Sequence, residues 1–93
     1  MDKEFDWDPH KDASNQRKHG VSFEEAATVF ADPLALYVFD DAHSADEERF
    51  HVIGLSIRRR VLFVVHCERH DVLRIISARR ATRTEEADYA QGL

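Results

Sequence analysis

Two very short connectors in the second half of the sequence limit the folds that this chain can adopt. Strand-like runs rich in β-branched and aromatic residues cover 49–57, 61–68 and 72–78, and three residues separate each run from the next. Connectors of that length join antiparallel neighbours, whereas parallel strands need a crossover of about a dozen residues or more. A fourth run covers 34–39. We therefore expect an antiparallel sheet of about four strands, with the apolar run at 61–65 in its centre.

Helix signals precede these strands. A first helix is expected over 9–19, because a proline fits its first position and Gly20 is a natural stop. Ser22 and Glu25 have the spacing of a capping box, so they open a second helix. Asp32-Pro33 ends that helix, because the residue before a proline avoids the helical conformation. The N-terminal third therefore predicts two helices.

A short helix is also expected after the strands. Thr82 and Glu85 repeat the capping-box spacing, and Gly92 marks the end of this last helix. Before the first helix, Phe5 and Trp7 alternate with acids, which predicts either a very short strand or a packed extended arm. Two N-terminal helices, the sheet and a C-terminal helix make an α+β fold, with residues 1–93 as a single domain.

Composition narrows the class of protein. Hydrophobic residues make up 43% of the chain, which is enough for one core. The sequence has no apolar run of the roughly 18 residues that a membrane span needs, and its acidic N-terminus lacks the apolar segment of a secretion signal. The single cysteine, Cys67, excludes an internal disulfide. The six histidines show no metal-ligand spacing. We expect a cytoplasmic protein without metal, cofactor or membrane partner.

The charge distribution is more informative than the net charge of −5. Residues 57–84 hold eight arginines against two acids, Glu68 and Asp71, a balance of +6 inside an acidic protein. Arginine presents a planar fork that suits phosphate. This basic block predicts either an anion site or a solvated face with cross-strand ion pairs, and charge alone slightly favours the solvated face.

The strands supply candidate groups for phosphodiester chemistry. His66 and Glu68 are two residues apart and share one face of a strand, about 7 Å from each other. A short hairpin turn would place one of them near Arg74 on the next strand, which gives a base beside a cationic clamp. The structural alternative is a buried, hydrogen-bonded histidine and a cross-strand ion pair between Glu68 and Arg74.

Two strings of residues resemble the BrnT family of toxins, which belongs to the RelE-like superfamily. The match covers nearly the whole chain, and its two parts fall in the expected order. The first string is Trp7-Asp8, Lys11, Asn15, 18–26, Phe30 and Asp32-Pro33, and the second is Glu48-Arg49-Phe50, Gly54 and 74–81.

The resemblance implies a RelE-like fold and an endoribonuclease toxin of a type II toxin–antitoxin system. Such a toxin inhibits translation by cutting RNA, ribosome-associated mRNA included, without a metal ion. The 2′-OH attacks the neighbouring phosphate, and arginine stabilises the phosphorane. The implied partner is a BrnA-type antitoxin, which neutralises the toxin and contacts operator DNA.

The resemblance also assigns roles to the arginines of the last strand. Arg79 is the implied phosphate clamp, and Arg74 is a second catalytic cation. Arg80 is either a further RNA contact or a surface charge. Strict alternation along the strand would put Arg74 and Arg80 on one face and Arg79 on the other.

Three cations outside that strand are further candidates. Lys18 and His19 lie in the last turn of the first expected helix, where cations complement the helix dipole, and the family string suggests RNA contact for both. Arg49 follows a run of acids and is either a third catalytic cation or one half of a sheet-edge ion pair.

Three classes of function remain open on sequence alone. The first is the endoribonuclease toxin. The second is a non-catalytic partner in an autoregulatory DNA-binding repressor complex, in which the basic block meets DNA or an acidic tail of the antitoxin. The third is a metal-dependent hydrolase that uses the histidines, which their irregular spacing disfavours.

Overall fold

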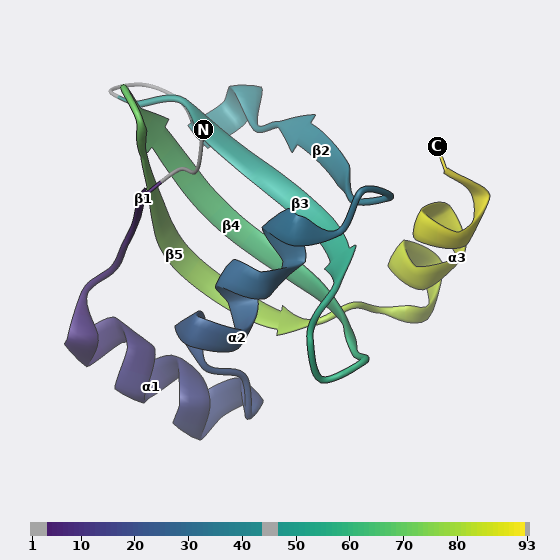
Figure 1. Ribbon diagram of the computed structural model, residues 1–93, viewed down its shortest axis with the longest axis horizontal. Coiled ribbons are helices and arrows are strands. Elements are labelled where there is room, and N and C mark those ends of the chain that lie inside the picture. The colour runs from purple at the N-terminus through teal and green to yellow at the C-terminus, as the bar shows by residue number, and fades with distance from the viewer. Residues whose placement is uncertain (1–3, 44–46, 93) are drawn as a thin grey trace.

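The computed structural model describes residues 4–43 and 47–92, and in this part of the chain helices pack on both faces of a five-stranded mixed sheet (Figure 1). The strand order is β1-β5-β4-β3-β2. The elements, in chain order, are β1 (Glu4–Asp6), α1 (Pro9–His19), α2 (Phe23–Thr28), the 3-10 turn η1 (Val29–Ala31), β2 (Leu36–Phe39), the 3-10 turn η2 (Asp41–His43), β3 (Arg49–Leu55), β4 (Val61–Arg69), β5 (Val72–Arg80) and α3 (Arg83–Gln91).

The expected α+β class is confirmed, but the expected sheet is wrong in one respect. The strands β2 to β5 form the antiparallel part, as the short connectors predict. The additional strand β1 pairs in parallel with β5, through Glu4 with Val72 and Asp6 with Arg74. The sequence predicts either a very short strand or an extended arm here, and the strand is the alternative found. Its partner is far away in the sequence, so its place in the sheet and its direction could not be deduced.

Helix α1 is held mainly by hydrogen bonds, because its sequence has almost no apolar face. Asp8 caps its first turn by accepting from the N–H of His10 at 2.8 Å. The buried Asn15 donates through Nδ2 to the carbonyls of Val21 and Ala78, at 2.9 and 2.7 Å, and its Oδ1 accepts from the N–H of Ala78 at 3.1 Å. One amide side chain therefore ties α1 to both the α1–α2 turn and β5.

Helix α2 is shorter than expected and continues as η1. Ser22 caps it, with Oγ accepting from the N–H of Glu25 at 3.0 Å. The Glu25 side chain turns inward and accepts from Ser56 Oγ at 2.7 Å and Arg60 Nε at 3.0 Å. The apolar side chains of α2 and η1 form the core with one face of the sheet. That core contains Val21, Phe23, Ala26, Val29, Val52, Leu62, Val64, Leu73, Ile75 and Ala78.

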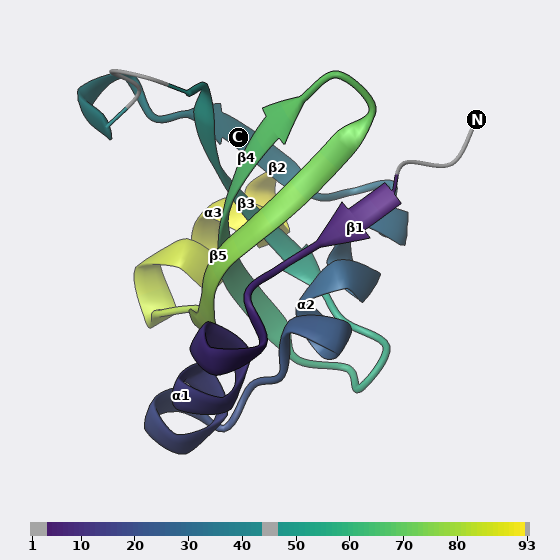
Figure 2. The ribbon, with the colours of Figure 1, turned by 90° about the vertical axis from the view of Figure 1, so that its left-hand side faces the viewer.

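Helix α3 lies on the other face of the sheet from α2 (Figure 2). The capping box predicted at Thr82 and Glu85 is present. Farther along the helix, the hydroxyl of Tyr89 donates to Asp32 Oδ2 at 2.6 Å, and this hydrogen bond is the main reason that the pKa of Tyr89 is raised to about 12. The same Asp32 oxygen accepts from the N–H of Leu55 at 2.8 Å, so α3 is anchored where η1 and β3 meet.

Gly54 allows η1 to lie close against β3. A Cβ at this position would be 3.2 Å from the Cβ atoms of Ala35 and Val29 and 3.3 Å from the Val29 carbonyl oxygen. Val29 is fully buried and has little room to move. We expect Gly54→Ala to lower the free energy of unfolding by about 1–2 kcal/mol, because overpacking outweighs the gain in strand propensity.

Urea unfolding measures this change directly. Ala35→Gly in the Gly54→Ala background removes one of the crowded contacts and should recover part of the loss. If Gly54→Ala is as stable as the parent, the close approach of η1 to β3 does not require glycine.

Candidate functional site

A β-bulge in β5 decides where the arginines point. The register pairs Val65 with Ser77 and His66 with Ile75, so Ile76 is an extra residue on β5. An inserted residue reverses the alternation beyond it. Arg74 and Arg79 therefore lie on the same face, the one that carries α3. The expectation that Arg79 points away from Arg74 is wrong, because strict alternation does not anticipate a bulge.

The same register places Arg80 on the opposite face of the sheet from Arg74 and Arg79. It pairs with Leu62, whose side chain is in the core between the sheet and α2, so Arg80 is on that side of the sheet. The expectation that Arg74 and Arg80 share a face is therefore also wrong. Lys18 and His19 are exposed in the last turn of α1 and are likewise not on the α3 side.

Arg49 joins Arg74 and Arg79 on the α3 side. The register aligns Arg49 of β3 with Cys67 of β4, and Cys67 with Arg74 of β5. The buried thiol of Cys67 is therefore flanked by an arginine on each neighbouring strand. Beyond Arg74 the row ends at Asp6 of β1, whose carboxylate forms an ion pair with the Arg74 guanidinium.

His51 is a member of this face that sequence reasoning missed. It follows Arg49 by two residues on β3, so the two side chains share a face, and this spacing was the signal available in the sequence. Its Nε2 lies 3.0 Å from Asp40 Oδ2. The imidazole packs against the Phe63 ring, with 4.9 Å between centroids. We call Arg49, His51, Arg74 and Arg79 the cationic face.

Arg79 is fixed by contacts on two sides. Its guanidinium carbon lies 4.2 Å from the centroid of the Phe63 ring, so Arg79 and His51 contact the same aromatic side chain. It forms a bidentate pair with Glu85 of α3, at 2.8 and 2.9 Å. The hydrogen bonds of this pair raise the pKa of Arg79 and lower the pKa of Glu85. Arg79 thus links the first turn of α3 to the sheet.

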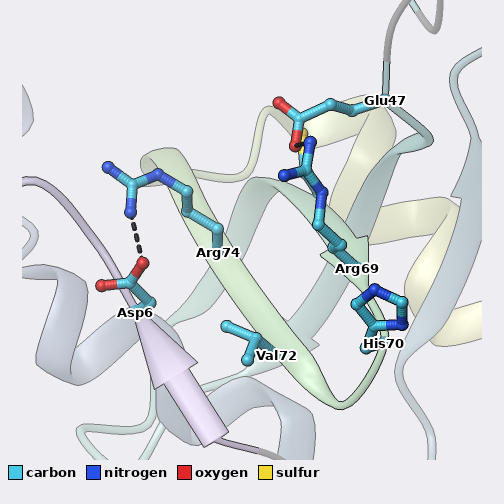
Figure 3. A pocket seen from close by; sticks show the side chains of 7 residues that line it. Asp6, Glu47, Arg69, His70, Val72 and Arg74 are labelled. Atoms are coloured by element: carbon cyan, nitrogen blue, oxygen red, sulfur yellow. Dashed lines mark hydrogen bonds and ion pairs between the residues drawn. The ribbon is translucent and has the colours of Figure 1, made fainter.

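A hollow of about 460 Å³ opens at the β4–β5 end of the cationic face (Figure 3). Arg74 lies on one side of it with Asp6, and Arg69 lies on the other side, with its guanidinium 3.3 Å from a carboxylate oxygen of Glu47. Arg79 does not line this hollow. The lining residues are Asp6, Glu47, Cys67, Arg69, His70, Val72 and Arg74.

His66 and Glu68 do not meet Arg74 as expected. The hairpin register aligns Arg74 with Cys67, whereas His66 and Glu68 point to the α2 side of the sheet. There His66 is fully buried, its ring stacked on Phe50 at 5.4 Å, with Nε2 3.1 Å from Glu68 Oε2. The predicted base-plus-clamp grouping is wrong because the true register places the neighbouring residue of β4 beside Arg74.

The described residues contain neither a metal-binding cluster nor a membrane-spanning helix. In residues 4–43 and 47–92, no three His, Cys, Asp or Glu side chains are grouped as a metal ion would need. None of the helices described there has the length and hydropathy needed to cross a membrane.

The chain matches a family model described as the ribonuclease toxin BrnT of type II toxin–antitoxin systems, over residues 7–85. No curated protein matches the sequence significantly. Among solved structures, the fold is similar to the 1.1 Å crystal structure of the Brucella abortus ribonuclease toxin BrnT, with a TM-score of 0.68 and 23% identity. That alignment covers 87% of this chain and 99% of the Brucella chain. Because the family model spans most of the sequence, the chain belongs to the BrnT family of ribonuclease toxins of type II toxin–antitoxin systems.

Proposed function

We propose that the cationic face binds RNA and cleaves its backbone without a metal ion. The observation that carries the proposal is that the bulge in β5 places Arg74 and Arg79 on one face together with Arg49 and His51. Three guanidinium groups and an imidazole on one surface match the needs of phosphodiester cleavage, namely cations for the developing charge and a group that transfers a proton.

The reaction that these groups suit begins with the ribose 2′-OH. Its oxygen attacks the adjacent phosphorus while a base takes its proton, and the arginines stabilise the extra negative charge of the phosphorane. The bond to the 5′-oxygen then breaks, and that oxygen receives a proton. The products are a 2′,3′-cyclic phosphate and a 5′-OH end.

We assign proton transfer to His51. Its ring faces the side that carries the arginines, and Asp40 at 3.0 Å can orient it. His66 with Glu68, the pair expected from the sequence, is fully buried among aromatic rings on the other face. A substrate on the cationic face could reach that imidazole only if the sheet opened. In this proposal His66 and Glu68 support the sheet.

Two carboxylates, Asp6 and Glu85, already pair with arginines of the cationic face and compete with RNA phosphate for them. Asp6 is half exposed and pairs with Arg74 at the hollow, so an RNA phosphate must displace it. Glu85 is more buried and holds Arg79 in a bidentate pair on the Phe63 ring. We propose that Arg74 exchanges partners when RNA binds, while Arg79 keeps Glu85 and offers the N–H groups that are not used on Glu85 and the Arg80 carbonyl. Lys18, His19 and Arg80 then contact only flanking RNA.

The family implies an antitoxin partner, and we propose that it is of the BrnA type, neutralises the nuclease and brings the complex to operator DNA. The acidic character of this chain, with a net charge of −5, fits a toxin that meets RNA at one local cationic surface. It also fits cleavage assisted by the ribosome, since phosphate neutralisation dominates non-specific RNA affinity.

Analysis of the cleaved ends tests the chemistry. The purified chain should give 2′,3′-cyclic phosphate and 5′-OH ends on free RNA in excess chelator, and the same ends on mRNA of translating ribosomes in a magnesium buffer. His51→Gln should lower the rate by about 10²–10⁴-fold. Products with 3′-OH and 5′-phosphate ends would contradict the mechanism, and an unchanged His51→Gln rate would move proton transfer to another residue. Growth arrest that persists unchanged in Arg79→Ala would favour the non-catalytic repressor partner.

A further inference from the structure

Strand β2 is an outer strand of the sheet and is strongly apolar. Tyr37, Val38 and Phe39 are 51%, 54% and 46% exposed, although none of them carries a charge. Natural sheets normally protect their edges with charged side chains, prolines or bulges. The opposite edge follows that rule, since β1 begins and ends with an acid. The β2 edge is therefore an exception within its own sheet.

The main chain of β2 is also available for pairing. The N–H of Asp40 donates to the carbonyl of Arg49 at 2.7 Å, which identifies these two residues as a hydrogen-bonded pair. Such pairs alternate along an antiparallel ladder, so Val38 is bonded to β3, whereas the N–H and C=O groups of Tyr37 and Phe39 point outward. They face a position that no strand of the described residues occupies.

Charge defines what kind of segment fits this edge. The exposed acids Asp41 and Glu48 lie just beyond the paired ends of β2 and β3. A strand running along β2 would pass its apolar side chains over Tyr37 or Val38 and reach these carboxylates at the Phe39 end. The surface therefore suits an extended peptide with alternating apolar residues and with lysine or arginine at that end.

We propose that an extended segment of the antitoxin adds to β2 as a new antiparallel or parallel strand. The inference rests on the antitoxin partner that the family implies, and it does not depend on the cleavage mechanism. Strand addition would satisfy the outward main-chain groups of Tyr37 and Phe39 and cover the apolar side chains. It would leave the antitoxin beside the cationic face, because Val38 is paired with His51.

Amide hydrogen exchange on the intact chain tests this placement. The probe is the cognate antitoxin that the family implies, identified by co-expression with this chain, purified and added to saturation. In the free toxin, the amides of Tyr37 and Phe39 should exchange quickly while that of Val38 is protected. In the complex, Tyr37 and Phe39 should slow by about tenfold or more. Fast exchange at both residues in the saturated complex would overturn the proposal, as would concentration-dependent protection without antitoxin, which means that two toxin copies pair at this edge.

A pair of lysine substitutions gives a second measurement. Val38→Lys should raise the Kd for the antitoxin by at least about tenfold, and Val38→Glu should raise it less, because the expected partner is basic. Ile57→Lys is the matched control, since Ile57 is an apolar side chain 75% exposed on the β3–β4 connector, away from the edge. Equal effects of Val38→Lys and Ile57→Lys would refute the proposal. If protection and affinity change as expected while RNA is not cleaved, only the proposed nuclease mechanism fails.

Discussion

Arg74→Ala is expected to slow RNA cleavage by about 10²–10³-fold, whereas Arg80→Ala should remain within about threefold of the parent. Both are exposed arginines of β5, but they lie on opposite faces of the sheet. Arg74 lines the hollow of the cationic face, where a cation can stabilise the phosphorane. Arg80 is on the face that carries the core, so its loss removes charge without touching the proposed site.

Single-turnover cleavage of an end-labelled RNA measures both variants, and urea unfolding shows whether either has lost stability. Asp6→Asn should have the opposite effect and raise the affinity for RNA. It removes the carboxylate that pairs with Arg74, so RNA should bind more tightly because the phosphate has no competitor. Equal losses in Arg74→Ala and Arg80→Ala would mean that the two arginines act only through general charge, and the assignment of the cationic face would be abandoned.

The bulge in β5 shows which part of the site could be deduced from the sequence. Arg49, Arg74 and Arg79 were identified as candidates from the basic block and the family strings. Their arrangement was not, because one extra residue, Ile76, reverses the faces on either side of it. Alternation gives the relative faces of residues only while the ladder is regular. His51 was accessible to the same reasoning, since it alternates with Arg49.

The fold was more predictable than the site, for a physical reason. Caps such as Asp8 and the Thr82–Glu85 box are local, so helices α1 and α3 were placed correctly. The three-residue connectors are also local signals, and they predicted the antiparallel hairpins β3–β4 and β4–β5 correctly. The parallel pairing of β1 with β5 depends on contacts between distant segments, and no period or spacing within the sequence contains that information. A buried, hydrogen-bonded His66 was one of two alternatives from the sequence, and the hairpin register was needed to choose between them.

A large loss of stability is expected where α2 meets the β3–β4 connector. Glu25 is almost fully buried, and both of its oxygens bind the Arg60 guanidinium. Burial raises the pKa of this carboxyl, but the hydrogen bonds from Arg60 and Ser56 more than offset it, so the pKa lies below its ordinary value. Arg60→Ala leaves a buried carboxylate without its cation. We expect the free energy of unfolding to fall by about 2–4 kcal/mol at pH 7, somewhat less than for a fully buried pair because Arg60 is partly exposed.

The pH dependence of this loss identifies its cause. In the parent, the depressed pKa of Glu25 stabilises the fold above the ordinary carboxyl range, and this contribution is lost as the pH falls through the folded pKa. In Arg60→Ala, burial dominates and raises the pKa, so the protonated carboxyl is favoured and the variant loses stability as the pH rises. Urea unfolding at pH 4 and pH 7 should therefore show that the variant differs less from the parent at pH 4 than at pH 7.

Two control variants separate charge from packing. Arg58→Ala, at an exposed arginine of the same connector, should change the free energy of unfolding by about 0.5 kcal/mol or less. Arg60→Ala with Glu25→Gln should be more stable than Arg60→Ala alone at pH 7, and a double variant as unstable as the single one would show that packing, not the uncompensated charge, causes the loss.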